Sequence, residues 1–414
     1  MADTARLESN IRKMYLFRFF QNFQFWWPIW VLYLTDLRGF SFTQVAVIEG
    51  LFFVSMMVVQ IPAGVFADRV GRKPVLVVGV LINAAVVFAF GTVDSFWPLF
   101  VTYLLWAWGM AIPMSADTAL IYDTLRQLKR EDEFQRVSGK YNAVFNLAIL
   151  ASLLTGAPLA AAIGLDVAIQ ISAIASLVAA GVALTLHEPD YKTGIFVSRS
   201  VIGFLKDTFA AARSSPGMPF LLGLYGFLTI GTMVTGVFFQ PFLSGHGVAL
   251  GDVGYLQAPA RVMAVIGALT AVWFSARLGE NRFLFAVAAS MSAGFFVLGV
   301  WNSLGAFFMF LFINMGSAMA LPVILDMLNR RIGSDQRATI MSAALISNAL
   351  LASAFAPLLG TIADAHSLSV GFLIGGFVIA AGSGLLLAGF VLSSRHEAGV
   401  GGVREPKAAA GRPP

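Results

Sequence analysis

Long apolar segments separated by short polar breaks fill almost the whole chain. Each segment holds roughly 20 residues or more, the length that an α-helix needs to cross the hydrocarbon core of a bilayer. The pattern predicts twelve such segments from near Tyr15 to Leu392. The predicted spans are residues 14–36, 43–67, 74–93, 96–122, 140–163, 167–187, 217–243, 252–276, 283–301, 304–329, 338–363 and 369–392.

The composition is that of a membrane protein. Of the 414 residues, 58% are hydrophobic and 12% are charged, so the apolar surface exceeds what a soluble fold buries. The first apolar run lacks a small-residue cleavage site and continues through Trp26, Trp27 and Trp30, so we expect no cleaved signal. The chain has no cysteine, which excludes disulfides, iron–sulfur clusters and thiolate metal sites. We expect no cofactor and no metal.

The positions of lysine and arginine predict the orientation. With the N-terminus in the cytoplasm, nearly all of the basic side chains between spans fall on that side, and Arg38 falls in an outer loop. This is the bias that orients inner-membrane proteins. The net charge of +5 is therefore a signal of topology rather than of nucleic-acid binding. We predict a multi-pass protein of the inner (plasma) membrane with both termini in the cytoplasm, in contact with lipid.

The longest internal break separates six spans from six. We predict an N-terminal six-helix bundle over residues 1–187, a cytoplasmic linker with an amphipathic surface helix over 188–216, a C-terminal six-helix bundle over 217–393 and a flexible cytoplasmic tail over 394–414. Short segments of the two halves match in order, such as Ala157-Pro158-Leu159 with Ala356-Pro357-Leu358. Such a parallel repeat predicts two bundles related by a pseudo-twofold axis.

A ten-residue segment follows the second predicted span: Gly64-Val65-Phe66-Ala67-Asp68-Arg69-Val70-Gly71-Arg72-Lys73. It matches Gly-x-x-x-Asp-Arg-x-Gly-Arg-Arg/Lys, the loop signature between the second and third helices of the major facilitator superfamily, at every specified position. The chain therefore resembles this superfamily, in its bacterial drug-efflux-like branch, over essentially all twelve spans. The resemblance implies a transporter that works by alternating access and is not an enzyme.

The same segment predicts a conformational latch. Gly71 permits a tight turn, and the resemblance implies that Asp68 is offered to the positive N-terminal end of the eleventh helix, which begins near Arg337. It also implies that Arg72 pairs with Asp123 at the end of the fourth helix. The predicted latch residues, which would close the cytoplasmic side, are Gly64, Asp68, Arg69, Gly71, Arg72, Lys73 and Asp123. The alternative is that these charges only fix the topology.

Four ionisable side chains fall within predicted spans: Arg18, Glu49, Asp117 and Arg261. A charge there costs several kcal/mol unless it is paired or hydrated, so each is a functional candidate. Arg18 and Asp117 lie at similar depths, which allows an ion pair. Glu49 is the preferred proton carrier, because apolar surroundings favour a protonated carboxyl group, and Asp117 is the second. Arg261 could hold an anionic group, pair with Glu49 or extend toward the outer surface.

The resemblance further implies that helices 1, 4, 7 and 10 line a central cavity. The candidate cavity residues are Asn22, Phe25, Tyr33, Asp36, Trp106, Met110, Met114, Tyr225, Thr229, Thr232, Gln240, Asn314 and Ser317. On helices 1, 4 and 7 these positions follow helical spacing. A wall rich in aromatic and methionine side chains suits a hydrophobic or weakly cationic solute. The alternative is that these side chains pack against other helices or face lipid.

The preferred function is efflux of small amphipathic or hydrophobic molecules by a monomeric antiporter coupled to H⁺. A transporter of a polar metabolite, such as a sugar or an organic acid, is an alternative, although few amides and carboxylates face the predicted cavity. A polytopic membrane enzyme is a more remote alternative, because the four histidines are scattered near span ends without ligand spacing. A channel is disfavoured, because no selectivity filter or ring of charges is evident.

Overall fold

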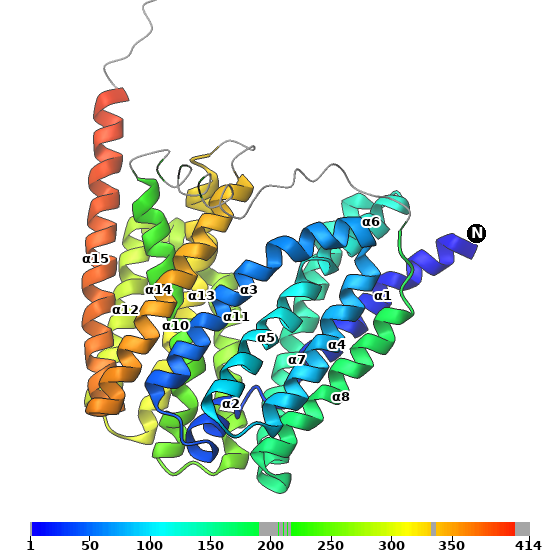
Figure 1. The fold of residues 1–414 in the computed structure, drawn as a ribbon. Coiled ribbons are helices and arrows are strands. Elements are labelled where there is room, and N and C mark those ends of the chain that lie inside the picture. The colour runs from blue at the N-terminus through cyan, green and yellow to red at the C-terminus, as the bar shows by residue number, and fades with distance from the viewer. Residues whose placement is uncertain are drawn as a thin grey trace, which may run out of the picture.

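The computed structural model describes residues 2–189, 217–332 and 337–401, together with residues 206, 210 and 213. Within these residues every regular element is a helix (Figure 1). The elements are α1 (Ala2–Asn22), α2 (Trp30–Leu32), the π-helical η1 (Tyr33–Leu37), α3 (Phe42–Val70), α4 (Arg72–Thr92), α5 (Phe96–Met114), α6 (Asp117–Gln127), η2 (Glu131–Glu133), α7 (Phe134–Ile163), α8 (Leu165–Leu184), α10 (Met218–Gly245), η3 (Leu250–Asp252), α11 (Val253–Leu278), α12 (Glu280–Val300), η4 (Leu304–Phe307), α13 (Phe308–Asn329), α14 (Arg337–Ala365) and α15 (Leu368–Gly401).

The helical crossings follow the predicted spans. Eleven helical segments of the described chain are long and apolar enough to cross a membrane, with α5 and α6 counted as one. The interrupted run of α1, α2 and η1 is the additional crossing that the sequence predicts. At the other end of the chain α15 continues to Gly401, beyond the predicted boundary at 393. Most of the predicted linker helix lies outside the described residues, and the domain boundaries stay predictions.

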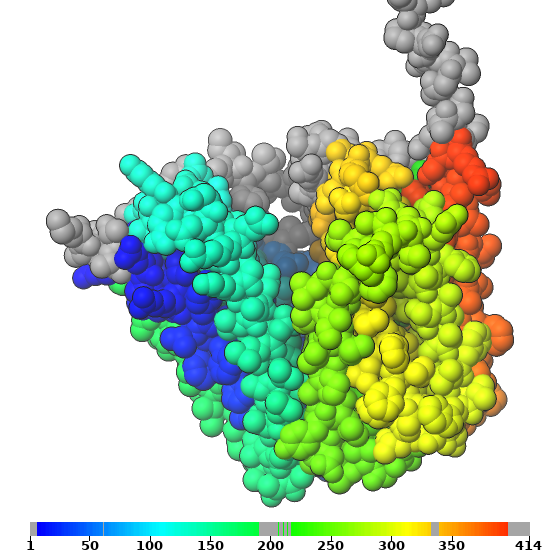
Figure 2. Space-filling model, turned by 180° about the vertical axis from the view of Figure 1, so that it is seen from behind, coloured from blue at the N-terminus to red at the C-terminus, as the bar shows by residue number. Residues whose placement is uncertain are grey.

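The helices form two groups that lean apart toward one end of the molecule (Figure 1). Elements α1 to α8 pack mainly against one another, as do α10 to α15, and the groups meet chiefly through α3 against α14 and α7 against α11. We call the end that carries the N-terminus the terminus side, and the end where α3 begins the opposite side. The surface is hollowed between the groups on the terminus side, whereas the groups lie in contact on the opposite side (Figure 2).

The first crossing is broken near its middle. Helix α1 ends at Asn22, residues 23–29 are not helical, and α2 begins at Trp30. Pro28 within this break has no N–H to donate, and it disfavours the helical conformation at the residue before it. The sequence pattern placed Arg18, Asn22 and the positions after them on one stripe of a continuous helix. The break changes the direction of every side chain beyond Asn22, so that stripe does not exist.

Non-helical backbone inside a membrane needs hydrogen-bond partners from the protein, because lipid offers none. Two serines of the N-terminal group provide part of them. The Gln24 N–H donates to Ser152 Oγ on α7, and the Phe25 N–H donates to Ser172 Oγ on α8, each at 2.9 Å. Both serine side chains are buried.

Backbone carbonyls accept from the N–H groups of Phe23, Trp27 and Ile29. Two glutamines of the C-terminal group provide further contacts to this region. Gln240 on α10 accepts from the Val31 N–H at 3.0 Å and donates to the Trp27 carbonyl at 3.1 Å. Gln257 on α11 donates to the Pro28 carbonyl at 3.1 Å. The break is therefore bonded to both groups of helices, and it joins them near the middle of the first crossing.

Replacing Ser152 with alanine should destabilise the protein, because the buried Gln24 N–H loses its acceptor. We expect a loss of about 1–2 kcal/mol in unfolding free energy, measured by thermal or denaturant unfolding in detergent micelles. Thr155 on the same helix is the matched control, since it is exposed and its hydroxyl bonds to the Ala151 carbonyl of its own helix. Equal stability of the Ser152→Ala and Thr155→Ala proteins would contradict this role of the serine.

Candidate functional site

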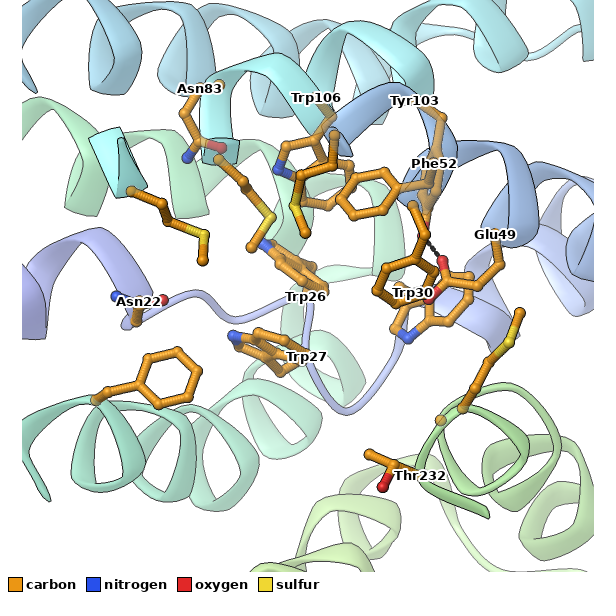
Figure 3. A pocket seen from close by; sticks show the side chains of 18 of the residues that line it. Asn22, Trp26, Trp27, Trp30, Glu49, Phe52, Asn83, Tyr103, Trp106 and Thr232 are labelled. Carbon is orange, nitrogen blue, oxygen red and sulfur yellow. Dashed lines mark hydrogen bonds between the residues drawn. The ribbon is translucent and has the colours of Figure 1, made fainter. Parts of the chain in front are cut away.

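A cavity of about 400 Å³ lies between the two groups of helices beside the break (Figure 3). This volume falls within the range of small-molecule sites. Aromatic and methionine side chains make up half of the residues in its wall: Trp26, Trp27, Trp30, Phe52, Phe53, Met56, Tyr103, Trp106, Met110, Met114, Phe145 and Met233. The polar residues of the wall are Arg18, Gln21, Asn22, Glu49, Asn83, Thr229, Thr232, Arg261 and Asn348.

The structure brings about half of the candidate cavity residues to this wall. These are Asn22, Trp106, Met110, Met114, Thr229 and Thr232. Gln240 and Asn314 instead line a smaller adjoining cavity of about 80 Å³. The candidates that line neither cavity are Phe25, Tyr33, Asp36, Tyr225 and Ser317.

Two of these residues have specific partners elsewhere. Tyr33 is fully buried, and its hydroxyl donates to the Phe90 carbonyl at 2.6 Å. Asp36 lies at the opposite side, where it accepts hydrogen bonds from Thr35 and Ser244. Both positions follow the break, which accounts for their departure from the predicted stripe.

The tryptophans around the break and the contribution of α3 to the cavity were not predicted from the sequence. Trp26, Trp27 and Trp30 project from the broken segment toward the cavity (Figure 3). Phe52 and Met56 reach it from α3, a helix outside the four that were expected to line it. The cluster of tryptophans around Pro28 was the available signal, because it is an unusual composition for an uninterrupted helix.

Glu49 lies on the cavity wall among aromatic side chains. Tyr103 Oη donates a hydrogen bond to Glu49 Oε2 at 2.5 Å, drawn as a dashed line beside Trp30 in Figure 3. No cation lies within ion-pair distance of this carboxyl group among the described residues. A carboxyl group so placed, with one neutral donor and access to the cavity, is suited to binding and releasing a proton.

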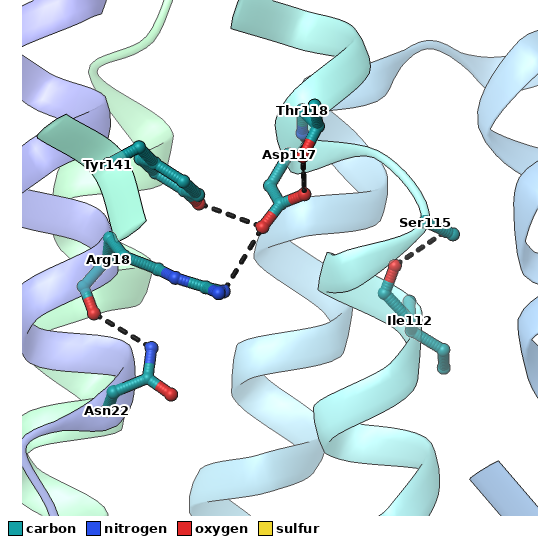
Figure 4. Close-up of polar contacts among 7 residues, drawn as sticks. All are labelled: Arg18, Asn22, Ile112, Ser115, Asp117, Thr118 and Tyr141. Carbon is teal, nitrogen blue, oxygen red and sulfur yellow. Dashed lines mark hydrogen bonds and ion pairs between the residues drawn. The ribbon is translucent and has the colours of Figure 1, made fainter. Parts of the chain in front are cut away.

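Arg18 and Asp117 form a buried ion pair where α6 begins, just after the end of α5 (Figure 4). The Arg18 guanidinium lies 3.2 Å from Asp117 Oδ2, which also accepts from the Tyr141 hydroxyl at 2.9 Å. The other carboxylate oxygen accepts from the Thr118 N–H and hydroxyl. The Arg18 side chain also packs over the rings of Tyr141 and Phe145. Asp117 is therefore a fully engaged anion.

The loop signature forms a cluster within the N-terminal group on the terminus side. Arg72 lies 2.5 Å from Asp68 Oδ1 and 3.5 Å from Asp123 Oδ2. Asp68 Oδ2 is buried and has no hydrogen-bond partner among the described residues. The Arg337 side chain and residues 333–336 lie outside the described part, so the predicted contact of Asp68 with the start of α14 stays a prediction.

Glu188, the first residue of the predicted linker, completes this cluster. Glu188 accepts from the backbone N–H of Arg72 at 2.6 Å and of Lys73 at 2.7 Å, which caps the N-terminus of α4. Gly71 precedes these residues with φ of +111°, a conformation that favours glycine. The chain that leaves the N-terminal group is thus bonded to the loop signature.

The opposite side carries a second acidic contact, and this one joins the two groups. Asp364 near the end of α14 accepts from the N–H of Phe42 at 2.9 Å, the N–H of Thr43 at 2.8 Å and the Thr43 hydroxyl at 2.6 Å. These N–H groups begin α3, where a helix attracts negative charge. Gly360, one turn earlier, lies so close to the Phe42 backbone that a Cβ would sit 2.8 Å from it.

Asp364 also had a signal in the sequence. Gly360-Thr361-Ile362-Ala363-Asp364 repeats the Gly-x-x-Ala-Asp spacing of Gly64-Val65-Phe66-Ala67-Asp68. The first segment ends α14 on the opposite side and the second ends α3 on the terminus side. The two acidic residues therefore occupy corresponding places at the two ends of one helix pair.

The comparisons with known proteins agree with this arrangement. The family model described as Major Facilitator Superfamily matches residues 14–357, which is more than half of the chain. The inner membrane transport protein YajR of Escherichia coli (strain K12) is 26% identical over 190 residues, which cover 46% of this chain and 40% of YajR. The matched part of the chain thus spans less than half of that relative.

Three solved structures share the fold at low identity. The nucleoside transporter NupG has a TM-score of 0.74 at 13% identity, over 94% of this chain and 99% of NupG. A bacterial homologue of the human lysosomal transporter Spinster, inward-facing and unoccupied, has a TM-score of 0.74 at 16% identity, over 95% and 97% of the two chains. The peptide transporter POT in complex with sulfate has a TM-score of 0.73 at 14% identity, over 93% and 95%.

These findings define the class of the protein. A multi-pass helical protein with a cavity between two groups of helices has the architecture of a membrane transporter. The chain belongs to the major facilitator superfamily, and it is a secondary transporter rather than an enzyme. The predicted fold class, two bundles of six helices, is confirmed.

Replacing Asp364 with asparagine should weaken the closure of the opposite side. The asparagine side chain can still accept a hydrogen bond, but it lacks the negative charge that the N-terminus of α3 attracts. The side chain is exposed, so we expect a loss of only about 1 kcal/mol, or roughly a fivefold shift toward opening. The readout is the labelling rate of a Thr232→Cys cavity residue by a membrane-impermeant maleimide added on the opposite side. The chain has no other cysteine, so the background is clean.

Asp252 provides the matched control for this experiment, because it is an exposed carboxylate on the same side of the molecule. The Asp252→Asn protein should label at the parent rate. An Asp364→Asn protein that also labels at the parent rate would show that the contact does not hold the opposite side closed.

Proposed function

We propose that this protein exports small amphipathic or hydrophobic molecules in exchange for protons, working by alternating access in the inner membrane. The observation that carries the proposal is the cavity itself, with a wall rich in aromatic and methionine side chains and one carboxyl group, Glu49, without a cation partner among the described residues. Apolar solutes gain by leaving water for such a wall. Aromatic and methionine side chains outnumber the polar positions of the wall, which gives less support to a sugar or another polar metabolite.

The bias of Lys and Arg supports a cytoplasmic position for the terminus side. The hollow then opens toward the cytoplasm, and the contact of Asp364 with α3 closes the outer side (Figure 2). This is an inward-facing form, and the similar fold of the Spinster homologue in an inward-facing conformation supports it. A cargo molecule enters the cavity from the cytoplasm in this form.

The loop signature acts in the outward-facing form, in which the cytoplasmic side is closed. When the cytoplasmic side closes, the N-terminus of α14 approaches the end of α3, and Asp68 binds it as Asp364 binds the N-terminus of α3 in the present form. Arg72 pairs with Asp68 and is itself held by Asp123. The unpartnered Asp68 oxygen in the inward-facing form supports this exchange of latches.

Proton coupling resides in Glu49 rather than Asp117. Asp117 accepts hydrogen bonds from Arg18, Tyr141 and Thr118, so protonation of its carboxylate would weaken several contacts at once. Glu49 has the Tyr103 hydroxyl, which donates to an ionised carboxylate and can also bond a protonated one. Protonation of Glu49 therefore needs less rearrangement.

The class of cargo is tested with purified protein in proteoliposomes, against a panel of lipophilic solutes of different charge, sugars and polar organic acids. The proposal expects transport of lipophilic solutes that a pH gradient drives uphill. Accumulation of sugars or polar acids alone would contradict it, and would favour a transporter of polar metabolites.

Replacing Glu49 with glutamine should abolish uphill transport driven by a pH gradient while leaving downhill exchange of cargo. The amide mimics the protonated carboxyl group permanently, so no proton is carried in the cycle. Both modes are measured in the same liposomes, with Asp36→Asn as a control carboxylate that lies outside the cavity wall. Undiminished gradient-driven accumulation by the Glu49→Gln protein would eliminate Glu49 and leave Asp117 or another ion as the coupling element.

A further inference from the structure

We propose that the cargo carries a negatively charged group that binds Arg261, so that the site selects amphipathic anions. This inference rests on the proposed function and specifies its substrate class. Arg261 lies on α11 and lines the main cavity. Among the described residues it has no ion pair and no hydrogen bond, and its one described interaction is with the ring of Trp27, 5.6 Å from the guanidinium carbon.

Arg261 stands where two cavities of different character meet. The main cavity is large and aromatic, whereas the adjoining cavity of about 80 Å³ is lined on its polar side by Gln240, Gln257 and Asn314. Arg261, Thr232 and Trp27 belong to both walls. A molecule with an apolar body and a small polar head fits this pair of spaces, with the head beside the guanidinium.

The hydrogen-bond donors in the small cavity show which head group is favoured. Gln240 and Gln257 use their amide N–H groups on the carbonyls of Trp27 and Pro28 and on second acceptors nearby. Asn314 uses one of its two amide N–H groups on the Ala260 carbonyl. The five N–H donors of the Arg261 guanidinium are the principal ones left. Their fork geometry matches a carboxylate or a similar planar anion.

The charges on the wall of the main cavity also favour an anionic head group. Arg18 is neutralised by Asp117, and Glu49 is neutral when it carries the coupling proton. The wall then has one uncompensated charge, the positive charge of Arg261. A lipophilic cation would be repelled by it, and an uncharged solute would leave it unpaired in a water-poor space. An anion compensates it, and in the proposed orientation an interior-negative potential also favours the exit of an anion.

The test uses three probes that share one ring system: naphthylacetate, naphthylacetamide and naphthylethylamine. Their binding to the detergent-purified full-length protein is measured by isothermal titration calorimetry. We expect the anion to bind at least about tenfold more tightly than the amide, because a hydrogen-bonded charge is added. The amine should bind more weakly than the amide.

Replacing Arg261 with glutamine should remove the preference for the anion while leaving the affinity for the amide within about twofold. Arg261→Lys keeps the charge without the fork and should retain part of the preference, which separates loss of charge from misfolding. Arg277→Gln is the matched control. Arg277 lies on the same helix and also packs on a tryptophan ring, that of Trp273, but it is exposed outside the cavity.

The outcomes separate this inference from the proposed function. If the amide and the amine bind and are transported but the anion is not preferred, the inference is wrong and amphipathic efflux stands. A preference for the anion that survives Arg261→Gln also overturns the inference, because another residue then holds the charge. If none of the three probes binds, both the inference and the proposed function are contradicted.

Discussion

The rest of the structure depends on one constraint: the backbone of residues 23–29 must find hydrogen-bond partners inside the membrane. Lipid provides none, so the break in the first crossing depends on local backbone hydrogen bonds and on side chains of other helices. Serines on α7 and α8 accept from two of its N–H groups, and glutamines on α10 and α11 donate to its Trp27 and Pro28 carbonyls. Because those glutamines belong to the C-terminal group, the break also ties the two groups together near the middle of the first crossing.

The position of the cavity follows from this break. Residues on a continuous helix would present one narrow stripe, whereas the turn of the chain brings Trp26, Trp27 and Trp30 to one wall within five residues. Trp26 and Trp27 stack with centroids 4.3 Å apart, and Trp26 meets the edge of Trp106. The aromatic wall is therefore built by contacts between the break and α5, and Arg261 reaches it from the other group of helices.

The two ends of the molecule use related chemistry. On the opposite side, the carboxylate of Asp364 at the end of α14 binds the start of α3. On the terminus side, Asp68 at the end of α3 is the counterpart, and it is bonded within its own group through Arg72. An acidic residue at a helix N-terminus is a modest electrostatic contact, and such a contact suits the proposed exchange of closed ends.

Much of this could be predicted from the sequence, and the reasons are physical. Hydrophobic length gives the crossings, and the loop signature gives the family, because both depend on residues close together along the chain. The cavity wall was harder: Asn22 and Trp106 were found, while Tyr33 and Asp36 were misplaced by assuming an unbroken helix. Partners such as Ser152 and Gln257 are ordinary residues, and their importance comes only from the backbone groups that the fold sets beside them.

The central claim is that the two groups of helices exchange one closed end for the other. Distances between spin labels on introduced cysteines test it directly, since the chain has none of its own. One pair, Thr92→Cys with Val300→Cys, reports on the opposite side, and another, Asp132→Cys with Asn281→Cys, reports on the terminus side. Measured by pulsed electron paramagnetic resonance across pH and with cargo, the first distance should lengthen in the conditions where the second shortens. Distances that stay fixed at both ends, or that lengthen at both ends together, would contradict the account.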